Sequence, residues 1–384
     1  MLKSMLFGGA VEIRSWVATL GGSGNDYGNS VTVAPDGSVY VCGSTASVGA
    51  GNQDLLLAKF NSSGTVQWQK TLGGSGNDRG YSVTVAPDGS VYVCGYADST
   101  GAGSQDLLLA KFSSSGTVQW QKILGGRSGD YGNSAAVAPD GSVYVCGYTF
   151  SVGAGNQDLL LAKFNSSGTV QWQKTLGGSG NDYGNSVTVA PDGSVYVCGY
   201  TFSADAGNQD LLLAKFNSSG TVQWQKILGG SNVEFGYTVA VAPDGSVYVC
   251  GYTSSVGAGN YDLLLAKFNS SGTVQWQKTL GGSGNDYGNS VTVAPDGSVY
   301  VCGSTASVGA GNTDLLLAKI TDSLIGEYMA TLGVFTFQDV SLTLKSESLT
   351  SSNHDLSVSN AGLTVNTPSL TVGTPSLTTN LFTL

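Results

Sequence analysis

Hydrophobic and polar residues alternate in short runs along most of this chain, and the runs return every 52 residues. In one such unit, residues 30–34, 38–42 and 65–72 alternate, and residues 54–60 form a nearly continuous apolar run. Period-two alternation and short apolar runs are typical of β-strands, and nothing in the unit has a helical period. We therefore predict four strands in every unit.

Two kinds of connection join these strands. Pro-Asp-Gly at residues 35–37 and Asn-Ser-Ser-Gly at residues 61–64 are tight-turn sequences, whereas the other two connections are longer and rich in glycine. Successive connections in an antiparallel meander lie at opposite ends of the sheet. Both tight turns are therefore predicted at one end and both long loops at the other, and the Asp54 and Lys59 positions are expected to be solvated strand ends.

The repeats occupy residues 12–332 and predict an all-β fold. Each unit is apolar on both faces and needs a neighbour on either side, which a β-propeller provides. Six first, second and third strands predict six blades. The period is marked by one Trp and one Cys in each unit: Trp16, Trp68, Trp120, Trp172, Trp224 and Trp276, and Cys42, Cys94, Cys146, Cys198, Cys250 and Cys302.

Ring closure has two candidate strands. The chain begins with a lone fourth strand around Trp16, which we expect to pair with residues 314–320, the third strand of the last blade. Tyr328 lies one period after Trp276 and is the alternative, although its linker lacks the Asn-Ser-Ser-Gly turn.

The segments DLLLAKFNSSGTVQWQKTLGG and VYVCGYT resemble the β-propeller repeat of bacterial surface and secreted proteins, the SBBP repeat. The resemblance covers residues 12–332. It implies a propeller with a binding or scaffolding role, and it offers no catalytic residue to carry over. That family is usually described as seven-bladed, whereas this chain supplies six blades.

Composition excludes several classes of partner. The net charge is −10 and only 11% of residues are charged, which argues against binding to a nucleic-acid backbone. No apolar run is long enough to span a membrane. The cysteines occupy equivalent positions in separate units, so we expect buried free thiols rather than disulfides or metal ligands. We expect no metal and no cofactor.

The long loops carry most of the variation between units and are the predicted binding face. Aromatic rings beside amides and carboxylates suit sugars, and near-identical copies would add avidity. The alternative is that Asn, Asp and Gly only build turns there. Calcium is a poorer alternative because the EF-hand spacing is missing. The candidate ligand-binding residues are Asn25, Asp26, Tyr27, Asn77, Asp78, Arg79, Asp130, Tyr131, Phe150, Asn181, Asp182, Tyr183, Phe202, Glu234, Phe235, Asn285, Asp286 and Tyr287.

Catalysis is not expected. The single histidine, His354, lies outside the repeats, so the ring cannot hold a Ser-His-Asp or Cys-His arrangement. The repeated carboxylates share one environment, whereas an acid/base pair needs two.

Residues 333–384 have their own period of seven. Thr, Ser, Val, Pro and Gly exclude a sustained helix, so we predict short strand pieces joined by turns. Three chains wound together could bury the leucines, in a pattern that resembles the triple-stranded β-helix of phage spikes; the alternative is a disordered tail. The predicted oligomerisation residues are Leu342, Leu349, Leu356, Leu363, Leu370 and Leu377.

These features divide the chain into an extension (1–11), a propeller (12–332) and a stalk or assembly segment (333–384). We expect a structural or binding protein of a phage or phage-like virion, trimeric through residues 333–384. Its long-loop face would meet a host surface glycan or another virion subunit. The alternative is an adhesion or scaffold protein of the bacterial cell surface, or a secreted one; an enzyme is the least favoured reading.

Overall fold

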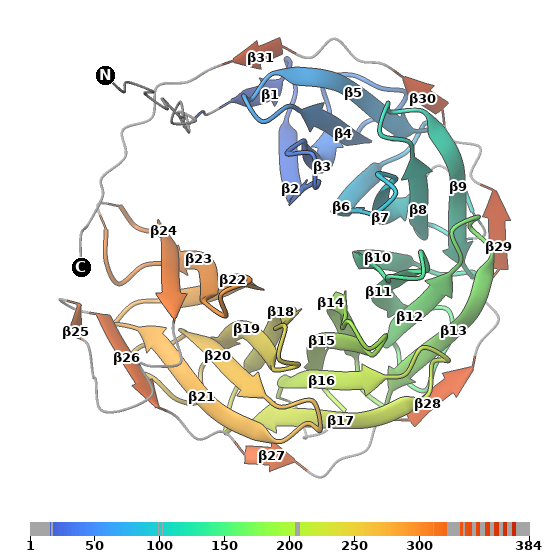
Figure 1. Cartoon of the computed structure of the whole chain (residues 1–384). Coiled ribbons are helices and arrows are strands. Elements are labelled where there is room, and N and C mark those ends of the chain that lie inside the picture. Colours follow the sequence, from blue (N-terminus) through green and yellow to red (C-terminus); the bar gives the residue numbers. More distant parts are fainter. Residues whose placement is uncertain are drawn as a thin grey trace, which may run out of the picture.

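The computed structural model describes residues 16, 18–98, 100–101, 103–203, 208–309 and 311–320, and seven short strands within residues 331–373. In this part of the chain every regular element is a β-strand. The strands form six radial sheets around a central axis, in the order of the sequence (Figure 1). The predicted all-β, six-bladed propeller of four-stranded repeats is therefore confirmed.

Each blade is an antiparallel meander that runs from the central axis to the rim (Figure 1). The innermost strands are β2 (Asp26–Val33), β6 (Asp78–Val85), β10 (Asp130–Val137), β14 (Asp182–Val189), β18 (Glu234–Val241) and β22 (Asp286–Val293). The second strands are β3 (Val39–Thr45), β7 (Val91–Ala97), β11 (Val143–Thr149), β15 (Val195–Thr201), β19 (Val247–Thr253) and β23 (Val299–Thr305).

The third strands are the apolar runs predicted from the sequence, with the predicted bounds in the first unit. They are β4 (Asp54–Phe60), β8 (Asp106–Phe112), β12 (Asp158–Phe164), β16 (Asp210–Phe216), β20 (Asp262–Phe268) and β24 (Asp314–Ile320). The fourth strands, at the rim, are β1 (Thr19–Gly21), β5 (Val66–Gly73), β9 (Val118–Gly125), β13 (Val170–Gly177), β17 (Val222–Gly229) and β21 (Val274–Gly281).

The hydrophobic core lies between blades rather than inside any one of them. Five apolar clusters each join side chains of two consecutive blades; Cys42 and Leu57, for example, pack with Val91 of the next blade. Leu57 and Cys42 are fully buried. Burying a leucine side chain is worth about 1.5–3 kcal/mol, so each blade depends on its neighbours for stability.

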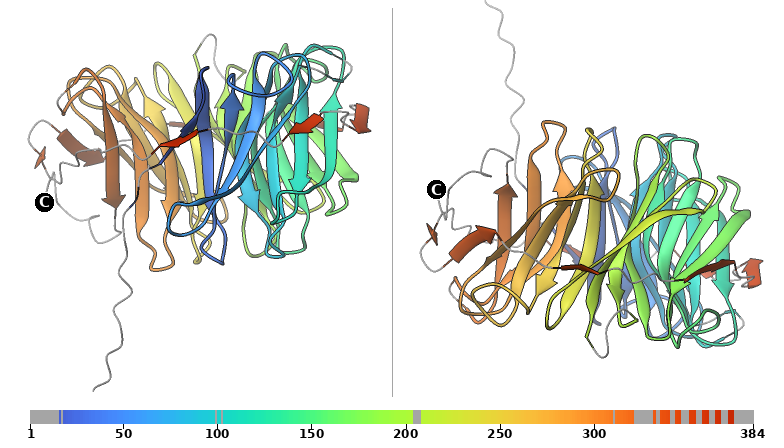
Figure 2. Two further views of the ribbon diagram at one scale, coloured as in Figure 1. Left: turned by 90° about the horizontal axis from the view of Figure 1, so that it is seen from above. Right: turned by 90° about the horizontal axis from the view of Figure 1, so that it is seen from below.

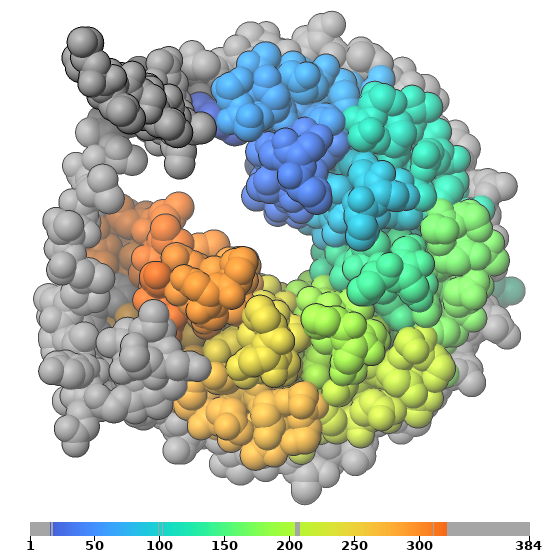
Figure 3. Space-filling view, viewed as in Figure 1, coloured from blue at the N-terminus to red at the C-terminus, as the bar shows by residue number. Residues whose placement is uncertain are grey.

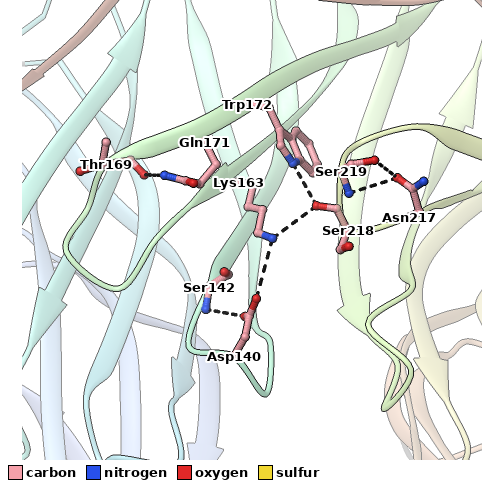
Figure 4. A network of polar contacts seen from close by, with 9 residues as sticks. All are labelled: Asp140, Ser142, Lys163, Thr169, Gln171, Trp172, Asn217, Ser218 and Ser219. Carbon is pink, nitrogen blue, oxygen red and sulfur yellow. Dashed lines mark hydrogen bonds and ion pairs between the residues drawn. The ribbon is translucent and has the colours of Figure 1, made fainter.

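A second interblade contact joins the short-turn ends, as Figure 4 illustrates for two blades. Nε1 of Trp172 donates a hydrogen bond to the backbone oxygen of Ser218 at 3.1 Å. Nζ of Lys163 donates to the same oxygen at 3.3 Å and lies 3.9 Å from a carboxylate oxygen of Asp140. The two tight turns therefore share one end of the blade, as predicted.

Among the described residues no strand closes the ring, and the predicted pairing of the first strand with the last blade is wrong. β24 is the outermost strand of a three-stranded sheet, and β1 pairs with β31 (Thr371–Gly373) of the tail instead. Nε1 of Trp16 nevertheless donates to the backbone oxygen of Ser62 in the first blade at 3.1 Å. Four other tryptophans bond the blade that follows them in the same way: Trp68, Trp120, Trp172 and Trp224. Tyr328, the alternative strand, lies outside the described residues.

The first and last blades expose apolar side chains whose equivalents in the other blades are buried. Val31 of the first blade is 64% exposed, whereas its equivalent Val83 is 5% exposed. Leu317 of the last blade is 68% exposed, whereas its equivalent Leu265 is 1% exposed. Figure 3 shows the space between these two ends. Five packed interfaces join the six blades, and no described blade covers either of the two end faces.

The prediction for the cysteines is confirmed at five of the six positions. Five are buried free thiols, whereas Cys302 is exposed because no further blade covers the last one. The prediction for Asp54 is wrong, since this residue is 1% exposed.

The described tail strands lie along the rim of the propeller, as Figure 2 shows from two sides. They are β25 (Thr331–Leu332), β26 (Phe335–Asp339), β27 (Thr343–Lys345), β28 (Thr350–Asn353), β29 (Ser357–Asn360), β30 (Thr364–Asn366) and β31. Each strand from β26 to β31 pairs with a fourth strand. The six leucines predicted to drive oligomerisation lie outside the described residues, and the trimeric stalk stays a prediction, because only one copy of the chain is present.

The exposed thiol of Cys302 provides a test of whether the ring of blades is open. A water-soluble thiol reagent should modify one cysteine in the native protein and none in Cys302→Ser, because the other thiols are inaccessible and burial keeps them protonated, raising the pKa of Cys94 to about 12. Reagent absorbance before and after denaturation counts both classes. A native protein without a reactive thiol would mean that the last blade is covered and that the ring of blades is closed.

A second prediction concerns the close pairing of the inner strands. A Cβ on Gly199 would lie 1.8 Å from the backbone oxygen of Tyr183. Gly199→Ala should therefore lower the free energy of unfolding by about 3 kcal/mol or more, since the backbone must shift. The control is Gly193→Ala in a tight turn, where φ is +81° and nothing lies within 4 Å; it should cost about 1 kcal/mol. Urea unfolding followed by fluorescence measures both, and equal losses would contradict this account.

Candidate functional site

The long-loop end of the propeller brings together aromatic side chains from the first and second strands of consecutive blades. Because the first strand begins and the second strand ends here, their aromatic residues stand opposite each other, as Tyr131 does with Tyr148 and Tyr183 with Tyr200. We call the continuous series the aromatic arc. It consists of Tyr96, Tyr131, Tyr148, Tyr183, Tyr200, Phe235, Tyr252 and Tyr287.

The arc alternates contacts within a blade and contacts between blades. Within blades the rings are nearly parallel: Tyr131 and Tyr148 have centroids 4.7 Å apart at 18°, and Tyr183 and Tyr200 4.5 Å apart at 19°. Between blades, Tyr148 meets Tyr183 edge-on at 4.8 Å. Such pairs add about 0.5–1.5 kcal/mol each beyond the area they bury. The arc is therefore a rigid surface that five blades build in common.

Further rings flank the arc and are more exposed. Phe150 lies 5.9 Å from Tyr148 and is 42% exposed. Phe202 lies 6.0 Å from Tyr200. Burial raises the pKa of Tyr96 to about 12, so this phenol stays protonated at neutral pH. The rings thus offer apolar faces together with neutral hydroxyl groups.

The arc ends at the first blade. There, Ser44 stands where Tyr96 and Tyr148 stand in later blades, and Ser304 does so in the last blade. Arg79 takes the place of a ring at the first-strand position, and its Nε donates to Oε1 of Gln53 at 2.6 Å. Tyr27, in the first blade, lies outside the aromatic arc and is 52% exposed.

The predicted carboxylates lie beneath this surface and hold the loops. Asp78, Asp130, Asp182, Glu234 and Asp286 are all fully buried. In each case a carboxylate oxygen accepts a hydrogen bond from the backbone N–H four residues earlier, at 2.6–3.0 Å. Their acceptor capacity is directed into the protein, which agrees with the turn-chemistry alternative.

The pKa values at these positions reflect burial against local hydrogen bonds. Burial raises the pKa of Asp130, although Thr149 and Ser151 donate to it. At the open end, burial of Asp26 is slight, and hydrogen bonds from Thr45 and Ser47 outweigh it, so the pKa of Asp26 lies below its ordinary value.

A second set of carboxylates, at the start of each third strand, pairs with the first. Oδ2 of Asp54 accepts from the N–H of Gly51 at 3.2 Å, inside the neighbouring long loop. Burial and the nearby negative charge of Asp78 raise the pKa of Asp54, and Asp262 is placed likewise beside Asp286. The described residues contain no group of three or more His, Cys, Asp or Glu side chains arranged to hold a metal ion.

The predicted asparagines join the two long loops through their backbones. Asn77, Asn181 and Asn285 form isolated parallel bridges with Gln53, Gln157 and Tyr261. The backbone oxygen of Asn25 accepts from the N–H of Ala46 at 2.9 Å. The structure therefore brings the predicted aromatic residues together except for Tyr27, whereas the acidic residues hold the loops. Binding by either group stays a prediction.

The sequence analysis missed half of the arc. Tyr96, Tyr148, Tyr200 and Tyr252 end the second strands, in the segment that follows the cysteine. The sequence did contain a signal. This position is Tyr in four units and Ser in two, so it varies between units as the long loops do. The sequence analysis ended the second strand at residue 42, so it counted this position in the long loop and did not single it out.

Comparison with known proteins supports the fold. Residues 34–66, 86–118, 138–170, 190–222 and 242–274 match a β-propeller family described as a domain of unknown function, DUF5122. Residues 16–48, 171–205 and 275–308 match the β-propeller repeat family SBBP.

Curated relatives are more distant. Regulatory protein FlaEY of Caulobacter vibrioides is 26% identical over 65% of this chain and 28% of its own length. An uncharacterized WD repeat-containing protein of Acanthamoeba polyphaga mimivirus is 19% identical over 68% of this chain and 27% of its own length. The chain thus spans little more than a quarter of these relatives.

Solved structures with a similar arrangement share little sequence. The WD40 β-propeller domain of Doa1 is 13% identical, with a TM-score of 0.38 over 74% of this chain and 93% of that one. A gluconolactonase from Xanthomonas campestris is 12% identical, with a TM-score of 0.37 over 80% of this chain and 99% of that one.

Within the described residues, no helix could cross a membrane. From the repeated family matches along its length, the chain belongs to the β-propeller repeat proteins.

Proposed function

We propose that this protein is a non-enzymatic binding scaffold that presents the aromatic arc to a glycan. A β-propeller fits a binding or structural role. The observation that carries the proposal is the unbroken contact of eight rings across five blades, flanked by the exposed ring of Phe150.

The chemistry of the arc favours sugars over charged ligands. Sugar rings have apolar C–H faces that stack on aromatic rings, and tyrosine hydroxyls can bond the sugar hydroxyls. Asp130 and Asp182 are fully buried, and one oxygen of each already accepts a loop N–H, so neither carboxylate is exposed to a ligand on this surface. Several weak sites along one ligand would add affinity through multivalency.

A surface position on a phage or phage-like particle is the setting we propose. The free thiols buried between blades suit folding in a reducing cell interior, where virion proteins are made. A cell-surface or secreted scaffold of a bacterium is the second candidate, because the repeats match the SBBP β-propeller family, which the sequence analysis associates with such proteins. Purification of the native protein separates the two: co-purification with capsid or tail proteins supports the particle, and recovery in a membrane fraction supports the cell surface.

The glycan proposal predicts loss of binding when the arc is interrupted. Tyr148→Ser with Tyr200→Ser introduces the residue that the first and last blades carry at this position, so the fold should tolerate it. Two lost stacking contacts should weaken binding roughly tenfold to a hundredfold, at about 0.7–1.4 kcal/mol per ring. Glycan-array screening followed by calorimetry on the strongest hit measures this.

Two controls keep this test specific. Val33→Ala alters an exposed apolar side chain on a first-strand face outside the arc and should leave the affinity unchanged. Ser304→Tyr adds a ring at the last blade and should strengthen binding. Unchanged affinity in the double serine variant, with unaltered thermal unfolding, would overturn the proposal.

A further inference from the structure

The tail strands occupy the rim of the propeller in a regular order. β26 pairs with β21, β27 with β17, β28 with β13, β29 with β9, β30 with β5 and β31 with β1, all antiparallel. Successive tail strands therefore visit successive blades in reverse order of sequence, around the outer wall of the disc (Figures 1 and 2).

The register is the same at every blade. The tail residue opposite the glycine that ends the fourth strand advances by seven at each step, while that glycine moves back by 52. The pairs are Thr336 with Gly281, Thr343 with Gly229, Thr350 with Gly177, Ser357 with Gly125, Thr364 with Gly73 and Thr371 with Gly21. Six repetitions of one register relate the two periods of the sequence.

The next tail residue stands opposite the leucine before that glycine. Val365 pairs with Leu72, Val358 with Leu124 and Leu344 with Leu228, and these blade leucines are fully buried. Residues directly opposite in an antiparallel pair lie on the same face of the sheet. Phe337 and Val372 occupy this register position too, and Ser351 is the exception.

Each seven-residue step of the tail contributes one strand that pairs with the rim. Seven extended residues reach about 23–25 Å at most. Three or four of them pair with a rim strand, as in β28, β29 and β30. The pairing also covers edges whose free N–H and C=O groups would otherwise invite association with other strands.

We propose that the rim of the propeller is a repeated strand-binding surface, specific for extended segments with this seven-residue period, and that strands β26 to β31 of the same chain are its ligand. Recognition combines main-chain pairing with an apolar residue opposite the rim leucine. The tail is then a belt that crosses every boundary from the first blade to the fifth, and its units bind with avidity because they are linked. The belt begins at β21, so the last blade lies outside it.

Engineered disulfides in the full-length chain test this belt. Lys174 stands opposite Asn353, and Lys122 stands opposite Asn360. Opposed residues in an antiparallel pair have Cα atoms about 4.5–5.5 Å apart, within the range of a disulfide. In a Cys302→Ser background, Lys174→Cys with Asn353→Cys, and Lys122→Cys with Asn360→Cys, should each lose both free thiols on mild oxidation and remain monomeric on a non-reducing gel.

The matched control exchanges the partners. Lys174→Cys with Asn360→Cys uses the same two rim and tail environments but places the cysteines on different blades, so both thiols should stay free. Equal disulfide yield in matched and exchanged pairs would mean that the tail has no fixed register and would overturn the belt. Cross-linked dimers or trimers from the matched pairs would overturn it too, since the rim would then hold the tail of another copy, as the trimer prediction requires.

Discussion

Each blade carries apolar side chains on both faces of one sheet, and only a neighbouring blade can cover them. One leucine position of the repeat shows both outcomes. Leu265 is 1% exposed between two blades, whereas Leu317, one period later in the last blade, is 68% exposed. Stability is therefore a property of the stack, as in other repeat proteins. The tryptophan that reaches the next blade's turn, and the buried cysteine, depend on this packing in the same way.

The strands and the number of blades could be predicted because they follow from local pattern. Alternation gives strand type, and a count of Val-Tyr-Val-Cys segments gives the blades. The angle between blades could not be predicted, because it depends on how side chains such as Leu57 and Val91 fit together across an interface. The Trp16 strand was assigned to the wrong end of the ring for this reason. Asp54 was misjudged because an acidic residue at a strand end resembles a solvated one, whereas a long loop folds over it.

The tail illustrates a different limit. Its seven-residue period was visible, and so was its division into short strands, but a hydrophobic period does not identify what covers it. Three copies of the tail and a row of blade edges both offer a partner to a strand that cannot form a core alone. The relation between the two periods exists only in three dimensions, where a rim glycine such as Gly73 meets a tail residue such as Thr364.

The two surfaces of the disc differ in how far the repeats preserve them. All six rim strands end in Leu-Gly, and this sameness is what a regularly spaced ligand requires. The aromatic end varies: Tyr131, Arg79 and Phe235 occupy one position, and Tyr148 and Ser44 another. Variation at the aromatic end leaves the rim unaltered. The aromatic residues lie on the first and second strands, nearer the axis, whereas the Leu-Gly pairs lie on the fourth strands at the rim. A chain built in this way can change what it binds at one end while its outer wall, and the strands paired with it, stay the same.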